Sequence, residues 1–511
     1  MVSRLHLEDW RIICHYLGAL ILLMAAVMCL PFALALALGE LDQAVIFLKC
    51  IGITGIVGAL LTLAQIKRGT MMRNQALVVT ALSWAVLAFF GTLPLWFSGH
   101  YASFLDALLE GVSGITATGL SIAVDLDHMA LSMVTWRFIL HLMGGVGVLV
   151  IALALGIFGT GAGAASIYTA EAREGRVMPE IRQMARFIFK VTAIIIAVGT
   201  VACSIPLLFG GQAPLRAAFS SLWITISAFA TGGMTGQSMG IMAYHSWPLE
   251  IISVCLMFFG IINFTLYGDI WKGRVKRLLK DIEVHTMAIW ILGLVLVLTI
   301  VVMSGDYFNS FTALLRRVVF LVISAATNVG FSTVYSGQLI YAMGSGALFM
   351  IGVGMIIGGS SSSTTGGIKA FRIGICAKTV VQTLREALVP DRVMPRTFYY
   401  HMGRKVLTAD LASSAMTIFL MYILTFAVGA VAGIICGYDA LPAIFESISA
   451  ASNGGLSAGI VSPGMPVFLE VVYIVEMLLG RLEFIAVFAM VLQVVHSLEP
   501  KAGWWWERRR S

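Results

Sequence analysis

Long apolar segments constrain the fold of this chain more than any other feature of its sequence. Ten of them follow one another, and each has about the 20 residues that an α-helix needs to cross the hydrocarbon core of a bilayer. Only 12% of the 511 residues are charged, whereas about a quarter of a soluble domain is charged. We therefore predict an all-α integral membrane protein with about ten transmembrane helices. The segments lie at residues 12–38, 43–66, 74–97, 134–158, 187–210, 248–270, 285–303, 343–368, 405–436 and 466–495.

Four shorter apolar stretches lie between the long segments. They have about 10–15 residues, which is too short to cross a bilayer, and we predict that they are re-entrant half-helices. The stretches are 104–113, 215–228, 311–325 and 441–450.

The basic residues predict the orientation of the chain. Most of the 33 Lys and Arg residues fall in loops that ten crossings place on one side of the membrane. The positive-inside rule makes this side cytoplasmic, with both termini on it, and it explains the net charge of +7 without a nucleic-acid partner. The run Leu17–Ala37 ends in small residues, as a signal peptide does, but it is longer than the usual h-region of about 7–15 residues. We interpret it as the first membrane helix.

A glycine-containing sequence follows each of the four short stretches. In each copy a Ser is followed six residues later by Gly, then by one apolar residue, then by Ser or Thr. A long apolar segment comes next, so the repeated unit is helix, half-helix, glycine loop, helix. The copies are SGITATGLS (113–121), SAFATGGMT (227–235), SAATNVGFS (324–332) and SAASNGGLS (449–457).

This unit predicts a pore. Irregular backbone at membrane depth is tolerated only where protein or a water-filled cavity covers it. Four copies around one axis would line a pore with backbone carbonyls, which can replace the hydration shell of an alkali cation. Glycine lets the chain aim these carbonyls at the axis, and the negative ends of the half-helices favour a cation. No acidic residue lies inside the loops, so a carboxylate ring selective for divalent ions is not expected.

Two further features lie within the last apolar segments of the chain. Arg481 sits inside a long apolar run, where a charge costs about 2.5–3.5 kcal/mol, so we expect either a functional role or a salt bridge to Glu446, Glu476 or Glu483. Residues 358–367 are all Gly, Ser or Thr and should not form a stable helix. We predict a flexible loop that lines the cavity, with a helix-packing surface as the alternative. Lys369 is either an anchor for this loop or a snorkelling lysine.

Other classes of protein fit the sequence less well. The chain has no HExxH, P-loop or GxSxG motif, and Gly159–Gly163 follows a membrane helix rather than a strand, so we do not expect an enzyme. Alternating-access transporters are commonly built from two repeats rather than four. His141 lies deep in a predicted span, and we interpret it as a packed, hydrogen-bonded side chain rather than a proton relay.

Several sequences outside the glycine loops carry a family resemblance. They are TWRFILHLMGGVGVLVIALA (135–154), GIINFTLYGD (260–269), GGSSSSTTGGIKAFR (358–372) and MLLGRLEF (477–484). With the four repeats, they make the chain resemble the Trk/Ktr/HKT superfamily of K⁺ transporters. Residues 12–66 match the additional N-terminal helix pair of its TrkH-type members.

The resemblance implies a role for individual residues. The family has an intramembrane gating loop, which falls on 358–367 and includes Gly358, Gly359, Gly366 and Gly367, and its pore-facing arginine falls on Arg481. The first filter position is Gly119, which in the family goes with K⁺ rather than Na⁺. Met234 and Asn328 depart from the family pattern. The selectivity filter, with K⁺ as its bound ion, falls on Thr118, Gly119, Gly232, Gly233, Val329, Gly330, Gly454 and Gly455.

The resemblance also implies an activity, partners and a location. We expect gated K⁺ uptake, with an Na⁺-coupled or Na⁺/K⁺-coupled cation transporter of the same superfamily as the alternative. K⁺ is the transported ion, no organic cofactor is expected, and the family is a homodimer in the bacterial inner (plasma) membrane. Its cytosolic regulatory subunit binds nucleotides and is of the TrkA/KtrA type. The expected domains are an N-terminal helix pair (1–73), pore repeats 1 to 3 (74–170, 171–280 and 281–400), and repeat 4 with the tail (401–511).

Overall fold

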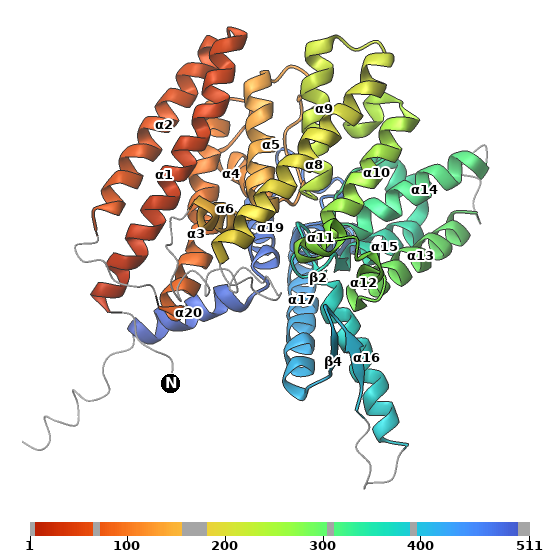
Figure 1. The fold of residues 1–511 in the computed structure, drawn as a ribbon. Coiled ribbons are helices and arrows are strands. Elements are labelled where there is room, and N and C mark those ends of the chain that lie inside the picture. The colour runs from red at the N-terminus through yellow and green to blue at the C-terminus, as the bar shows by residue number, and fades with distance from the viewer. Residues whose placement is uncertain (1–5, 65–71, 156–180, 304–310, 389–395, 499–511) are drawn as a thin grey trace, which may run out of the picture.

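The computed structural model describes residues 6–64, 72–155, 181–303, 311–388 and 396–498. In this part of the chain nearly all regular structure is helical, apart from two small two-stranded sheets (Figure 1). This confirms the predicted all-α fold. The tail GWWWERRR and the glycines of 159–163 lie outside the described residues.

Six helices among the described residues are long and apolar enough to cross a membrane. The count rises to eight if each of two bent helix pairs is one span, so the predicted ten spans are not confirmed. The six helices are α1 (Leu7–Leu38), α2 (Leu41–Thr62), α3 (Arg73–Phe97), α8 (Ile181–Phe209), α13 (Ile282–Met303) and α17 (Ala409–Ile435).

Four of the predicted long segments are interrupted. Segment 134–158 becomes α5 (Leu131–Val146) and α6 (Val148–Leu155), which are separated at Gly147 with φ 94°. Segment 343–368 is helical only in α15 (Gly344–Ile356). The other two segments bend sharply, by 104° between α10 (Trp247–Ile261) and α11 (Phe264–Trp271), and by 109° between α19 (Val467–Arg481) and α20 (Ile485–Leu498).

The four short apolar stretches each form one helix. They have 12, 16, 16 and 12 residues, and the first begins at a capping box in which Ser103 and Asp106 exchange hydrogen bonds. The helices are α4 (Phe104–Ile115), α9 (Pro214–Phe229), α14 (Phe311–Ala326) and α18 (Ala440–Ala451).

The remaining elements are short, apart from α16. The strand pair β1 (Ile357–Gly358) and β2 (Ile368–Lys369) is parallel, with Ile357 opposite Ile368. The hairpin of β3 (Phe398–Tyr400) and β4 (Arg404–Val406) is antiparallel, with Tyr399 opposite Lys405. The other helices are η1 (Gly240–Tyr244), α12 (Val275–Leu278), η2 (Gln338–Ala342) and α16 (Ala370–Glu386).

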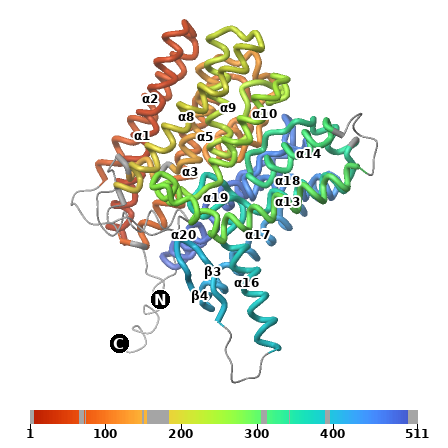
Figure 2. The backbone as a smooth tube through the Cα atoms, turned by 45° about the vertical axis from the view of Figure 1, so that its right-hand side comes forward, coloured from red at the N-terminus to blue at the C-terminus, as the bar shows by residue number. Residues whose placement is uncertain are grey.

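The arrangement of the elements separates a broad helical body from a narrow extension. Helix α16 and strand β4 project from the lower end of the body in Figure 1, and Figure 2 shows β3 beside them. The buried apolar side chains form two large clusters, one mainly from the N-terminal half of the chain and one mainly from α10 to α17. Helices α9 and α18 contribute to both clusters, so these two short helices lie between the two cores.

Candidate functional site

All four short helices end in the same backbone motif. After α4 the amide of Thr118 donates to the carbonyl of Ser113 at 2.9 Å, across a residue in the left-handed conformation, Ala117. This is a Schellman motif, which satisfies a carbonyl that the end of a helix otherwise leaves free. The equivalent bonds are Gly232 to Ser227 (3.0 Å), Val329 to Ser324 (3.0 Å) and Gly454 to Ser449 (2.8 Å).

The left-handed position is one that the shared sequence pattern does not mark. Its residues are Ala117, Thr231, Asn328 and Asn453, with φ angles of 52° or 53°. Asparagine tolerates this conformation better than most residues, and it occupies two of the four positions. The two asparagines could therefore have predicted the left-handed position in repeats 3 and 4. Alanine and threonine give no such indication in repeats 1 and 2.

The four glycines of the repeats lie in a closed ring, each against the backbone of the next repeat. A Cβ built on Gly119 would lie 2.0 Å from the carbonyl oxygen of Gly232, which is closer than real Cβ atoms come. The same holds around the ring, at 1.9 Å from Gly233 to Val329 O, 2.7 Å from Gly330 to Gly454 O and 2.3 Å from Gly455 to Thr118 O. Each glycine has a positive φ between 67° and 95°. The structure thus brings together all eight residues that the resemblance assigns to the filter.

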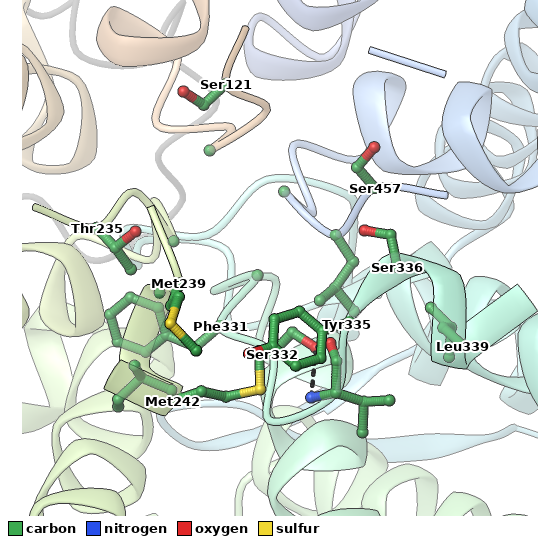
Figure 3. A pocket seen from close by; sticks show the side chains of 18 of the residues that line it. Ser121, Thr235, Met239, Met242, Phe331, Ser332, Tyr335, Ser336, Leu339 and Ser457 are labelled. Atoms are coloured by element: carbon green, nitrogen blue, oxygen red, sulfur yellow. Dashed lines mark hydrogen bonds between the residues drawn. The ribbon is translucent and has the colours of Figure 1, made fainter. Parts of the chain in front are cut away.

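A cavity of about 230 Å³ opens on one side of this glycine ring. Its lining includes all four ring glycines and the hydroxyl residue two positions after each of them. Figure 3 shows these hydroxyl residues, Ser121, Thr235, Ser332 and Ser457, together with the larger side chains around them. The space next to the ring is therefore polar, and none of the described residues that line it has a charged side chain.

Two buried carboxylates support the chain as it leaves the ring. Glu110 on α4 accepts hydrogen bonds from the Ser121 hydroxyl (3.0 Å) and the Ile122 amide (2.9 Å). Glu446 is at the same position of α18 and accepts from the Ser457 hydroxyl and the Ala458 amide, both at 2.7 Å. Ile224 and Leu321 occupy this position in the other two repeats, so only repeats 1 and 4 have a carboxylate here. We call Glu110 and Glu446, with the hydrogen bonds that they accept from the following loop, the braces of these repeats.

The brace on α4 is completed by Arg137 of α5. Its guanidinium contacts one oxygen of Glu110 at 2.5 Å and 2.9 Å, and it also donates to the carbonyl of Thr235 at 3.1 Å. Both charged side chains are about 1% exposed. The pair joins repeat 1 to repeat 2 beside the glycine ring and was not predicted from the sequence. The sequence feature that could have predicted this pair is the presence of one charged residue of opposite sign in each of two apolar segments, Glu110 in the first and Arg137 in the second.

His141 is buried and hydrogen-bonded, as the sequence analysis expected. Its Nδ1 lies 2.9 Å from the carbonyl oxygen of Gly114, and its Nε2 lies 2.8 Å from that of Gly232. The imidazole of His141 therefore connects the end of α4 to a backbone carbonyl of the glycine ring.

Two asparagine side chains also join neighbouring repeats. Asn328 donates to the carbonyl of Ser452 at 2.7 Å, and Asn453 donates to the hydroxyl of Thr118 at 2.8 Å. These bonds connect repeat 3 to repeat 4 and repeat 4 to repeat 1. The residues that hold the left-handed turn thus also connect the repeats.

The Gly/Ser/Thr stretch 358–367 is not helical, as predicted, and every one of its residues is buried. It packs beside the glycine ring, because a Cβ on Gly366 would lie 2.5 Å from the carbonyl oxygen of Ser452. The Thr364 hydroxyl donates to the carbonyl of Phe229 at 2.9 Å and lies 3.3 Å from the hydroxyl of Thr231. The stretch is therefore in contact with the chain just before the ring residues of repeats 2 and 4.

Arg481 connects this stretch to the first repeat. Its guanidinium donates to the carbonyl of Thr364 at 2.7 Å, and to the carbonyls of Gly144 and Gly145 at the end of α5. The arginine also lies over the ring of Trp84, with 5.5 Å to its centroid. The three carboxylates considered as partners for Arg481 have contacts of their own, Glu446 with Ser457, Glu476 with Ser447 and Glu483 with Arg372.

The two ends of the stretch are also fixed. The ammonium of Lys369 donates to the carbonyl of Thr365, and the lysine is only 6% exposed, whereas a snorkelling lysine would extend its ammonium to water. The hydroxyl of Tyr422 donates to the carbonyls of Gly367 (3.1 Å) and Gly480 (2.9 Å). The stretch is therefore bound to α17 and α19 as well as to its own flanking strand.

A buried polar cluster holds the middle of the stretch. The carboxylate of Glu283 on α13 accepts from the backbone amide of Ser361 at 2.7 Å and from its hydroxyl at 2.8 Å. Asp281, just before α13, contacts His401 of the β3–β4 turn at 3.2 Å. Burial lowers the pKa of His401, but the hydrogen bond that its imidazole donates to Asp281 and the charge of Glu283 outweigh this effect, so that the pKa lies above its ordinary value.

The chain is similar in sequence to known cation transport proteins. The sequence model of the TrkH family, described as a cation transport protein, matches residues 43–497. An uncharacterized cation transporter of Methanocaldococcus jannaschii is 27% identical and covers 96% of this chain and 97% of its own. The Trk system potassium uptake protein TrkH of Halomonas elongata is also 27% identical, with 93% and 97% covered.

A solved structure shares the fold. The crystal structure of the potassium transporter TrkH from Vibrio parahaemolyticus superposes with a TM-score of 0.80 at 24% identity. The superposition covers 96% of this chain and 99% of that one. The match of the family model over residues 43–497 confirms the resemblance inferred from the sequence, and the chain belongs to the TrkH family of cation transport proteins.

Proposed function

We propose that this protein is a K⁺ uptake pathway whose selectivity filter is the glycine ring. The closed ring of contacts, from each glycine to the carbonyl of the next repeat, carries the proposal. A K⁺ ion that loses its water needs several oxygen ligands at once, and four loops with the same backbone conformation supply them symmetrically. The ion is bound by Thr118, Gly119, Gly232, Gly233, Val329, Gly330, Gly454 and Gly455.

The surroundings of the ring suit a monovalent cation. Helices α4, α9, α14 and α18 each end just before the ring, so the partial negative charges of their C-termini lie close to it. The described residues that line the adjoining cavity have hydroxyl groups and no carboxylate, so they offer polar ligands without the charge that would retain a divalent ion. The braces at Glu110 and Glu446 hold the loops in place and are directed at the chain rather than at the ion path.

The stretch 358–367, with its terminal glycines Gly358, Gly359, Gly366 and Gly367, forms the gate together with Arg481. In the conformation described, this stretch lies directly against the residues that precede the ring, and the guanidinium of Arg481 is bound to its Thr364 carbonyl. A fixed positive charge in a region of low dielectric constant repels a passing cation. Opening requires the stretch to leave the Arg481 and Glu283 contacts, and Lys369 is the anchor at its end.

The topology and partners follow from the family and the basic loops. Both termini and the α16/β3–β4 extension lie in the cytoplasm, and the chain is a multi-pass protein of the bacterial inner membrane. It works as a homodimer with a TrkA/KtrA-like nucleotide-binding subunit docked on its cytoplasmic face. It is not an enzyme and carries no organic cofactor.

Growth of a bacterium that lacks its own K⁺ uptake systems tests the activity. Expression of this protein should restore growth at low K⁺, and purified protein in liposomes should conduct Rb⁺ faster than Na⁺. A protein that reaches the membrane but does neither would contradict the proposal. Rb⁺ uptake that requires an imposed Na⁺ gradient would instead favour a coupled transporter of the same superfamily.

A further inference from the structure

Asp281, Glu283 and His401 form a compact buried group away from the glycine ring. One ligand atom of each lies within 4.8 Å of the others, and Asp281 Oδ1 lies 3.2 Å from His401 Nδ1. Asp281 and Glu283 are fully buried, and His401 is 2% exposed. The group joins the start of α13 to the turn between β3 and β4, the two strands that Figure 2 shows beside α16.

In the part of the chain that the structure describes, no Lys or Arg lies within ion-pair distance of Asp281 or Glu283, and Lys405 of β4 acts on the group from a longer distance. Among the described residues, the only ion-pair partner of Asp281 is His401, and Glu283 has none. Within ion-pair distance, the described residues therefore offer the two buried carboxylates at most one positive charge, that of a protonated imidazole. Burying an uncompensated carboxylate is costly, and a bound cation is one of the ways in which proteins offset this cost.

The hairpin turn is built to place the imidazole here. Met402, next to His401, has a left-handed φ of 53°, and its amide donates to Asp281 Oδ2 at 3.2 Å. A non-glycine residue held in this conformation is strained by about 1–3 kcal/mol. The strained turn brings a nitrogen ligand to two oxygen ligands that lie about 120 positions earlier in the chain.

We propose that Asp281, Glu283 and His401 bind a divalent transition-metal cation of the zinc type. One imidazole nitrogen with two carboxylate oxygens is a ligand set that suits Zn²⁺, whereas Mg²⁺ and Ca²⁺ prefer oxygen alone. Bonds of about 2.1 Å at tetrahedral angles place ligand atoms roughly 3.4 Å apart. The 3.2 Å between Asp281 Oδ1 and His401 Nδ1 is close to this ligand-to-ligand distance. A carboxylate oxygen of Glu283 lies within 4.8 Å of both atoms, and a small movement of its side chain brings it to the same distance.

A metal at this site acts on the Gly/Ser/Thr stretch through Glu283. Oxygen Oε1 accepts both bonds from Ser361. Among the described residues, Oε2 accepts only one long hydrogen bond, from the side-chain amide of Asn263 at 3.3 Å, and it can therefore ligate. Hydrogen bonds to a ligating carboxylate orient it, and the bound metal in turn fixes the carboxylate. Occupancy therefore holds Ser361 in the conformation described, and it slows cation flux. The effect on flux rests on the proposed function, but metal binding itself does not.

Titration of the purified full-length protein with Zn²⁺ tests the site. Calorimetry should give one equivalent of Zn²⁺ per chain, and His401→Gln and Glu283→Gln should each weaken binding at least about tenfold. His285→Gln is the matched control, because His285 is one turn further along α13 and exposed, and this variant should bind as the wild type does. Equal binding by wild type and His401→Gln, or no binding by wild type, would overturn the proposal and leave a hydrogen-bonded cluster only.

Co²⁺ substitution keeps the test decisive if the variants do not fold. Wild-type protein with one Co²⁺ should show the intense visible absorption of tetrahedral coordination, whereas the weak spectrum of the hydrated ion would overturn the proposal. In liposomes, Zn²⁺ should slow Rb⁺ flux of the wild type and of His285→Gln, and His401→Gln should need at least about tenfold more Zn²⁺. Failure of the wild type to conduct Rb⁺ would count against the proposed function, while the binding data would still decide the metal site.

Discussion

Replacement of Gly119 by serine perturbs the ring where repeat 1 contacts repeat 2. The added Cβ would lie 2.0 Å from the carbonyl oxygen of Gly232, and this oxygen must move by about 1 Å to reach even 3.0 Å, a distance below which real Cβ contacts essentially never fall. The oxygen belongs to repeat 2 and already accepts the contact from His141. The substitution therefore displaces one of the carbonyls that we assign to the ion.

The energetic cost has two parts. A non-glycine residue at φ 95° is strained by about 1–3 kcal/mol, and forcing an extra atom into a packed site costs about 1–3 kcal/mol more. The sum of roughly 2–6 kcal/mol exceeds the 1.4 kcal/mol that changes an equilibrium tenfold. We expect most of it to be relieved by local displacement of the ring, so that ion selectivity is lost before the fold is.

Gly39→Ser separates the two parts of the cost. Gly39 has a similar φ of 74°, but no atom lies within 4 Å of a Cβ built on it. Relative Rb⁺ and Na⁺ flux in liposomes should shift toward Na⁺ for Gly119→Ser and stay at the wild-type ratio for Gly39→Ser. An unchanged ratio for Gly119→Ser, in protein that is folded and conducts, would refute the assignment of Gly119 to the filter.

Three further predictions concern the gate and the brace. Arg481→Gln should raise Rb⁺ flux into liposomes, because it removes the fixed positive charge beside the ring. The control variant Arg385→Gln, on the exposed part of α16, should leave Rb⁺ flux unchanged. Equal Rb⁺ flux for the two variants would argue against a gating charge at Arg481. Replacement of 358–367 by a shorter segment should also raise flux, and a fall would favour a packing role. Glu110→Gln should lower the midpoint of thermal unfolding, since it leaves Arg137 buried without its charge partner at a cost of about 3–5 kcal/mol. A midpoint within about 1 °C of wild type would show that the pair contributes little.

The sequence predicted well the structural features that depend on residues close together in the chain. The short helices end within a few residues of the expected positions, because each is an apolar stretch that stops at a Schellman motif followed by glycine. The non-helical character of 358–367 follows equally from ten consecutive small and hydroxyl residues. The four glycines were found because each must be glycine, and repetition made that requirement visible.

The breaks in the long segments were only partly predictable. The bend after Arg481 has no glycine or proline in it, and Glu483 and Phe484 instead take left-handed angles of 50° and 67°. Glu483 is bound there by Arg372, a residue more than a hundred positions away. A local pattern gives no sign of a turn that a distant partner holds in place.

The sequence by itself determined that this chain is a helical membrane protein with four glycine loops, because hydropathy and repetition depend on residue type and spacing alone. Only the tertiary structure decided which groups meet. Arg481 contacts Thr364 and Gly144, which are 117 and 337 positions away, and Asp281 contacts His401 across 120. A buried charge must find its partners wherever the packed helices place them, and that placement is a property of the whole fold rather than of any segment.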